Sequence, residues 1–174
     1  MNWRPRSLLA LLMLALGAAA AGWVRGEVYQ EPDAFVTEVF GTRPEPRVLW
    51  LTKDIQAQAA AILGHPPVQL RQRYWSGAHR SVWILEEIGK EEFITAGFVV
   101  ADGRIEHVRV LVYRESRGGE VRYPAFLQLF RGAKLAPGAR LDREIDGIAG
   151  ATLSVGAMER MARLALFFDR MSRQ

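Results

Sequence analysis

The sequence FITAGFVVADGRIEHVRVLVY, from Phe93 to Tyr113, decides the fold of this chain. Two runs rich in Val, Ile and Phe flank Asp102-Gly103, and Asp-Gly between apolar runs is a strong signal for a tight hairpin turn. We therefore predict two antiparallel strands, Phe93–Val100 and Arg104–Tyr113. Side chains of the second strand alternate between two faces, and we expect the face with three valines to meet the core: Val108, Val110 and Val112.

Further elements on both sides extend this hairpin into an α+β domain. Three strand-like runs precede it and are separated by turn residues: Arg47–Leu51, Val68–Tyr74 and Ser81–Glu87. Thr52 is placed to cap a helix that runs to Leu63 and ends at Gly64. After the hairpin we expect short helical turns at 123–130 and a loop at 134–140. The sequence thus predicts a single domain in which helices flank an antiparallel sheet.

The last part of the chain predicts a long amphipathic helix. From Leu153 to about Arg170, apolar residues such as Met158, Met161 and Leu164 recur at steps of three and four, with charged residues between them. Thr152 falls at the N-terminus of this helix.

The N-terminus has the three-part pattern of a secretory signal. Arg4 and Arg6 precede an apolar run that ends near Leu16, and small residues follow, with a cleavage site expected near Ala21. An uncleaved anchor is the alternative, because the apolar run is just long enough to span a bilayer. We predict three segments: a leader or anchor at 1–21, a helical and strand region at 22–76, and the main domain at 77–174. The leader implies export, with the protein in the periplasm or at the periplasmic face of the inner membrane.

Composition excludes several classes of function. The chain has no cysteine, which removes disulfides, thiolate catalysis, iron–sulfur clusters and most zinc sites. The three histidines, His65, His79 and His107, lie far apart without metal-ligand spacing. The net charge of +4 comes from scattered arginines, so no nucleic-acid partner is indicated. Neither a hydrolase elbow nor a nucleotide-binding glycine loop is present.

The segment DGIAGATLS, from Asp146 to Ser154, is the strongest candidate for a binding site. Ala149, Gly150 and Ala151 leave room for a bulky group beside the backbone. At a helix N-terminus, unpaired N–H groups and the helix dipole favour a phosphate next to Thr152. A threonine here is also typical of a structural N-cap, which is the more common explanation for an isolated Gly-Ala-Thr. Spacing alone leaves both interpretations open.

This segment resembles the flavinylation motif of the FMN-binding domain family, Asp-x-x-Ala-Gly-Ala-Thr, over 146–152. The family includes the covalent-flavin subunits of Na+-translocating NADH:quinone reductase and of the Rnf complex. The stretch from Ile94 to Val121 is similar to the family's paired strands and the Glu-Ser/Thr-x-Gly turn that follows them. Ala149 stands where serine is usual, and Leu153 stands where many members have a hydroxyl residue.

The resemblance implies that Thr152 carries FMN through a phosphoester bond. A separate Mg-dependent flavin transferase would attach the cofactor from FAD. Glu115 and Ser116 are then candidate hydrogen-bond partners of the flavin, and Gly118 and Gly119 provide close-approach backbone. Arg114 or Arg117 is a candidate to offset phosphate charge, with the alternative that both are exposed arginines without a specific role. The remaining implied contacts lie around the modified threonine: Ala149, Gly150, Ala151, Leu153 and Ser154. Asp146, with Gly150 and Ala151, would be read by the transferase.

Our leading hypothesis is an exported electron-transfer flavoprotein that relays electrons between membrane and periplasmic redox partners. Its partners would be the flavin transferase and a membrane redox protein or periplasmic electron carrier. The alternative is a periplasmic binding or sensory module with the same fold and no covalent flavin. A self-contained enzyme that reduces a small molecule is less well supported, because the sequence has no nicotinamide-binding motif.

Overall fold

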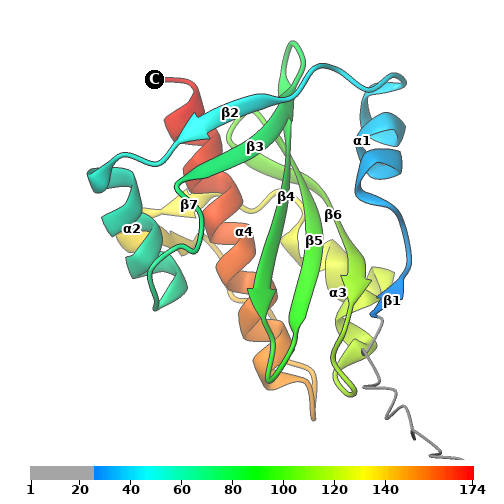
Figure 1. The fold of residues 1–174 in the computed structure, drawn as a ribbon. Coiled ribbons are helices and arrows are strands. Elements are labelled where there is room, and N and C mark those ends of the chain that lie inside the picture. The colour runs from blue at the N-terminus through cyan, green and yellow to red at the C-terminus, as the bar shows by residue number, and fades with distance from the viewer. Residues whose placement is uncertain (1–25) are drawn as a thin grey trace, which may run out of the picture.

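The computed structural model describes residues 26–174, so the predicted leader at 1–21 lies outside the described part of the chain (Figure 1). A six-stranded antiparallel sheet has the strand order β1-β6-β5-β4-β3-β2. Its strands are β1 (Glu27–Val28), β2 (Arg47–Trp50), β3 (Arg71–Ser76), β4 (Arg80–Ile88), β5 (Phe93–Ala101) and β6 (Arg104–Tyr113). The helices are α1 (Pro32–Phe40), α2 (Lys53–Leu63), α3 (Pro124–Leu127) and α4 (Thr152–Ser172). Three short 3-10 helices lie at Gly119–Arg122, Gln128–Phe130 and Pro137–Ala139, and β7 (Leu135–Ala136) pairs with β8 (Arg140–Leu141).

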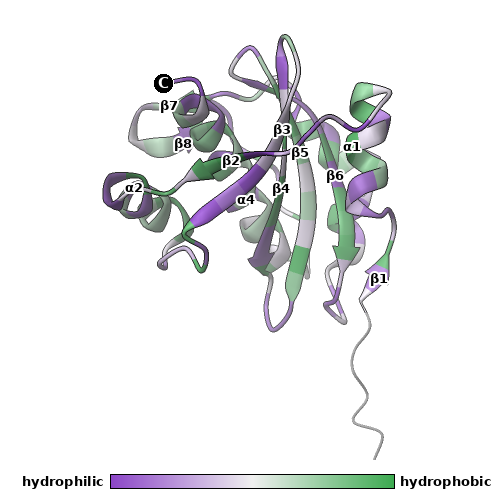
Figure 2. Cartoon of the chain, turned by 45° about the horizontal axis from the view of Figure 1, so that its top comes forward, coloured by the Kyte–Doolittle hydropathy of each residue, from purple (hydrophilic) through white to green (hydrophobic). Residues whose placement is uncertain are grey.

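The sheet separates two hydrophobic clusters, one on each face. Helix α4 lies along one face behind β4 and β5, and α1 covers part of the other (Figure 1). Between α4 and the sheet, the larger cluster includes fully buried Trp83, Phe98 and Met161. The smaller cluster, on the α1 side, contains Phe35 and Val36. In Figure 2, β5 and the end of β6 are largely apolar, while β3 and the end of β4 are polar. No helix in the described part of the chain is apolar over a stretch long enough to cross a bilayer.

Most predicted elements are present, so the expected α+β class is confirmed. Thr52 caps α2 by accepting a hydrogen bond from the Ile55 N–H at 3.4 Å, and Gly64 ends this helix in a left-handed conformation with φ 84°. Strand β3 begins at Arg71 and not at Val68. Residues 68–70 run past the sheet, where Val68 is 87% exposed.

The core face of β6 differs from the prediction, because two bulges change the alternation of its side chains. Val110 pairs with Ala96 while Val112 pairs with Thr95, so Leu111 is an extra residue in β6. The second shift lies between Val99 and Val100 of β5. Each bulge turns the following residues to the opposite face. Val108 and Val110 therefore face the main core as expected, whereas Val112 joins the α1 cluster.

Three short elements were not predicted from the sequence: β1, α1 and the β7–β8 pair. Helix α1 has two buried residues, Phe35 and Val36, too few to produce a clear periodic pattern. The segment predicted as a loop at 134–140 contains most of the small β7–β8 hairpin, in which Gly138 supplies a φ of 75°.

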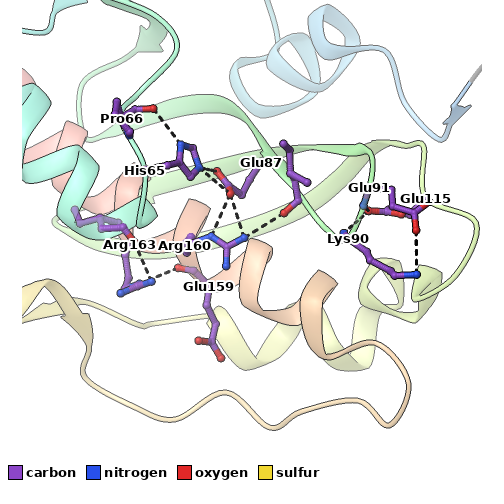
Figure 3. A network of polar contacts seen from close by, with 11 residues as sticks. His65, Pro66, Glu87, Lys90, Glu91, Glu115, Glu159, Arg160 and Arg163 are labelled. Atoms are coloured by element: carbon purple, nitrogen blue, oxygen red, sulfur yellow. Dashed lines mark hydrogen bonds and ion pairs between the residues drawn. The ribbon is translucent and has the colours of Figure 1, made fainter.

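Helix α4 is fixed to β4 by a buried polar network near its N-terminal half (Figure 3). The Glu87 side chain is 4% exposed and accepts hydrogen bonds from Arg160 Nε at 3.2 Å and Nη2 at 3.1 Å. His65 Nε2 lies 3.1 Å from the same carboxylate. Near the other end of the helix, Ser81 donates to buried Asp169 at 2.6 Å. These contacts set both the tilt and the axial position of α4.

We expect His65 to stabilise the fold more in mild acid than in mild base. The Pro66 carbonyl and the Glu87 carboxylate raise the pKa of His65 above its ordinary value. The stabilisation is therefore complete below the unfolded-state pKa and is lost as the pH rises through the folded-state pKa. Because the side chain is 44% exposed, we expect less than about 1 kcal/mol.

Urea unfolding of His65→Gln and the unaltered protein at about pH 5.5 and about pH 8.5 measures this effect. The substitution should lower the free energy of unfolding more at the lower pH. His79→Gln, at an exposed position in the β3–β4 turn, is the matched control. An equal pH dependence in both variants would contradict the assignment.

Candidate functional site

A cavity of about 470 Å³ lies where the turn after β6, the segment before α4 and the end of β1 meet. This volume is in the range of small-molecule sites. Two segments that are distant in the sequence contribute to its wall, residues 115–120 after β6 and Ala149-Gly150 before α4. The structure therefore brings the two predicted motifs to one place.

Gly118 allows the turn after β6 to lie close to the start of α4. Its φ is +79°, and a Cβ on it would lie 2.7 Å from Ser154 Oγ and 3.4 Å from the Cβ of Ala151. Any other residue would be strained in this conformation and would also push the turn away from the first turn of α4.

A buried hydrogen-bond chain joins the same two segments. The Tyr113 hydroxyl donates to the Arg117 carbonyl at 2.5 Å and lies 3.0 Å from Ser154 Oγ. Because the tyrosine has one hydroxyl proton, Ser154 is the donor in the second bond. Burial is the main cause of the raised pKa of Tyr113. This phenol therefore stays protonated at neutral pH and keeps the chain intact.

The N-terminus of α4 carries no side-chain cap. Ala151 is the N-cap residue, and Thr152 is the first residue of the helix, with its side chain exposed. Thr152 is thus one position past the place where a threonine would cap, and the interpretation as a structural N-cap is wrong. The N–H groups of the first helical turn remain suited to an anion.

The Glu115 carboxylate binds the backbone of the β4–β5 turn. Its Oε1 accepts hydrogen bonds from the backbone N–H groups of Lys90, of Glu91 at 2.7 Å and of Glu92 at 3.0 Å. Burial opposes ionisation, but the three N–H donors hold the pKa of Glu115 below its ordinary value. The carboxylate thereby fixes the β4–β5 turn to the exit of β6 (Figure 3). Its predicted contact with a cofactor stays a prediction.

The other predicted residues divide into three groups. Ser116, Gly118, Gly119, Ala149 and Gly150 line the cavity. Ala151 and Ser154 are buried behind it, and Asp146, Thr152 and Leu153 are exposed. Arg117 lines the cavity, whereas Arg114 is bound to the Phe93 carbonyl, Thr95 Oγ1 and Glu86.

Sequence reasoning missed a second part of the cavity wall. Tyr29, Arg122 and Tyr123 line the cavity, and the Arg122 guanidinium lies over both tyrosine rings. No pattern in the sequence links Tyr29 to a residue so far along the chain, since β1 has two residues and its pairing with β6 is a tertiary contact.

A larger hollow of about 710 Å³ lies elsewhere, along β3 and β4. It includes His65 and Glu87 from the network that fixes α4. None of the residues predicted from the motifs lines it, so the smaller cavity is the candidate site.

Comparisons with known proteins bear on the family and the fold. Residues 89–166 match the FMN-binding domain family, which confirms the resemblance carried by the two motifs. The chain is also similar to the crystal structure of NqrC from Shewanella oneidensis, with a TM-score of 0.58 and 15% identity. That similarity covers 79% of this chain and 88% of the NqrC chain, and at this identity it shows a common fold. A comparison with curated proteins found no match.

We expect Gly118→Ala to destabilise the protein and to separate the two segments. The added methyl would meet Ser154, and overpacking of this kind costs about 1–3 kcal/mol beyond the strain of the left-handed backbone. Gly138→Ala is the matched control, because Gly138 has a φ of +75° and no atom within 4 Å of a built Cβ. Urea unfolding of both variants isolates the packing cost, and equal losses of stability would argue against the close approach.

Proposed function

We propose, from the match of residues 89–166 to the FMN-binding domain family, that this protein is an electron-transfer flavoprotein with FMN bound covalently to Thr152. The observation that carries the proposal is the convergence of both family-like motifs on one cavity beside the uncapped start of α4. Either motif alone would have an ordinary structural explanation.

The residues present suit an esterified flavin phosphate. Thr152 is exposed, so another protein can reach its hydroxyl. Gly150 adopts a φ of +80°, and a built Cβ there meets no atom within 4 Å, which leaves space beside the threonine. The N–H groups and dipole of the 21-residue α4 favour a phosphate at this end. The cavity lined by Ala149 and Gly150 provides room for the rest of the cofactor.

Attachment requires a separate flavin transferase that uses FAD and Mg²⁺. The Thr152 oxygen attacks the phosphorus on the FMN side of the FAD pyrophosphate. A new O–P bond forms, the P–O–P bridge breaks, AMP leaves, and the hydroxyl proton is released. We assign Asp146, exposed near the start of this segment, to recognition by the transferase.

The bound flavin would supply one- and two-electron chemistry, and the protein would set its position and its electrostatic surroundings. The predicted leader, which lies outside the described residues, supports a location in the periplasm or on the periplasmic face of the inner membrane. A covalent bond suits that location, because a lost cofactor is not readily replaced there. We expect a membrane redox protein or a periplasmic electron carrier as the partner.

Thr152→Val should abolish flavin attachment in a host that contains the transferase. The unaltered protein should gain the mass of FMN less one water and a yellow absorbance, whereas the variant should remain colourless and unmodified. Intact-mass spectrometry and visible absorbance of the purified proteins measure this directly.

Thr37→Val is the control, because Thr37 is an exposed hydroxyl residue on α1 that does not line the cavity. This variant should keep the added mass. An unaltered protein without flavin would favour the binding or sensory module, and an added mass that persists in Thr152→Val would move the attachment to another residue.

A further inference from the structure

Arg122 is held between two tyrosines in the wall of the candidate flavin cavity. Its guanidinium carbon lies 5.0 Å from the ring centroid of Tyr29 and 4.9 Å from that of Tyr123. Its Nη1 donates to the Gly119 carbonyl at 3.3 Å. All of these residues line the cavity. A long side chain that is fixed by three neighbours loses little further freedom when it meets a ligand.

We call Arg122 with Tyr29 and Tyr123 on its two sides the clamp. The clamp depends on Tyr29, which lies outside the matched residues 89–166. Tyr29 follows β1, which pairs with β6 through Glu27 and Val28, and the Tyr29 N–H donates to the Leu111 carbonyl at 2.9 Å. Its hydroxyl donates to Glu27 at 2.7 Å. The backbone and the phenol of Tyr29 are therefore both positioned, and its ring is fixed against Arg122.

Arg122 has no ion-pair partner among residues 26–174. Other arginines form ion pairs within the fold: Arg114 pairs with Glu86, and Arg160 pairs with Glu87. Glu27, Glu115 and Glu120 also line the cavity, but none of the three forms an ion pair with Arg122. The positive charge of Arg122 is thus available to a ligand.

The wall of the cavity connects this charge to the start of α4. Gly118 lies against Ser154 and Ala151 in that region, and Arg122 binds the carbonyl of the next residue, Gly119. FMN has its phosphate at one end and its ring at the other. With the phosphate at Thr152, a ring that enters the cavity lined by Gly150 meets a wall that includes Arg122 and Tyr123.

We propose that Arg122, clamped by Tyr29 and Tyr123, is the cation at the edge of the flavin ring and raises the reduction potential of the bound flavin. The inference rests on the proposed covalent FMN. A fixed positive charge stabilises the net negative charge that uptake of two electrons and one proton leaves on a flavin. The surroundings are partly open to water, so the gain is moderate.

The test compares the midpoint potentials of flavinylated variants, measured by equilibrium titration against reference dyes. Arg122→Gln should lower the potential by about 30 mV, which is a tenfold loss of preference for the reduced flavin in a two-electron couple. Arg140→Gln removes the same charge from exposed β8, away from the cavity, and should change that preference by less than about twofold.

Two further variants keep the inference testable if Arg122→Gln does not acquire FMN. Arg122→Lys retains the charge and should leave the preference within about twofold of the unaltered protein. Tyr29→Leu removes one side of the clamp and should lower the potential in the same direction as Arg122→Gln, by a smaller amount.

Intact mass separates failure of this inference from failure of the proposed function. Unaltered protein without FMN refutes covalent attachment, and the assignment of Arg122 is refuted with it. Flavinylated Arg122→Gln with an unchanged potential overturns the assignment of Arg122 alone. A third outcome would also overturn the assignment of Arg122 to the flavin ring. If Arg122→Gln and Arg122→Lys both load less FMN while Tyr29→Leu keeps its potential, the arginine acts at the phosphate.

Discussion

The candidate site depends on the close contact between the turn after β6 and the first turn of α4. Gly118 makes this contact possible, because a side chain there would overlap Ser154. The buried Tyr113–Ser154 hydrogen bond then fixes the two segments to each other. Ala149 and Gly150, which precede the helix, thereby line the same cavity as Arg122 and Tyr123. Without the contact, the two motifs would be separate surface loops.

That contact in turn requires α4 to have a fixed axial position. Apolar packing against the sheet is not directional, so it permits a helix to slide or rotate by small amounts. Buried polar groups remove this freedom, since each must keep its partner. Glu87 with Arg160 acts in the N-terminal half of α4, and Asp169 with Ser81 acts near its C-terminal end. The start of the helix, with Thr152, is positioned by contacts distant from the cavity.

Much of the architecture was accessible from the sequence because it arises from local signals. Asp102-Gly103, Thr52 and Gly64 mark turns and helix ends through their own backbone preferences, and the long apolar period predicts α4. The family-like motifs located half of the cavity in the same way. The bulges of β6 were not accessible, because an extra residue in a strand leaves no compositional trace. The wall formed by Tyr29 was hidden for a related reason, since it depends on pairing between distant strands. Glu115 shows a third limit: its residue type suits a ligand, but three backbone N–H groups use the same oxygen.

The pairing of β1 with β6 also determines when the cavity is complete. Tyr29 is among the first residues of the described chain to be synthesised, yet the strand that holds it is made much later and lies in the middle of the sequence. A nascent chain therefore contains the tyrosine long before it contains the pocket. The threonine at the start of α4 is made later still, so a fully formed site can exist only after synthesis has passed both points. Any modifying protein that recognises the assembled cavity would therefore act only on chains that already contain both segments.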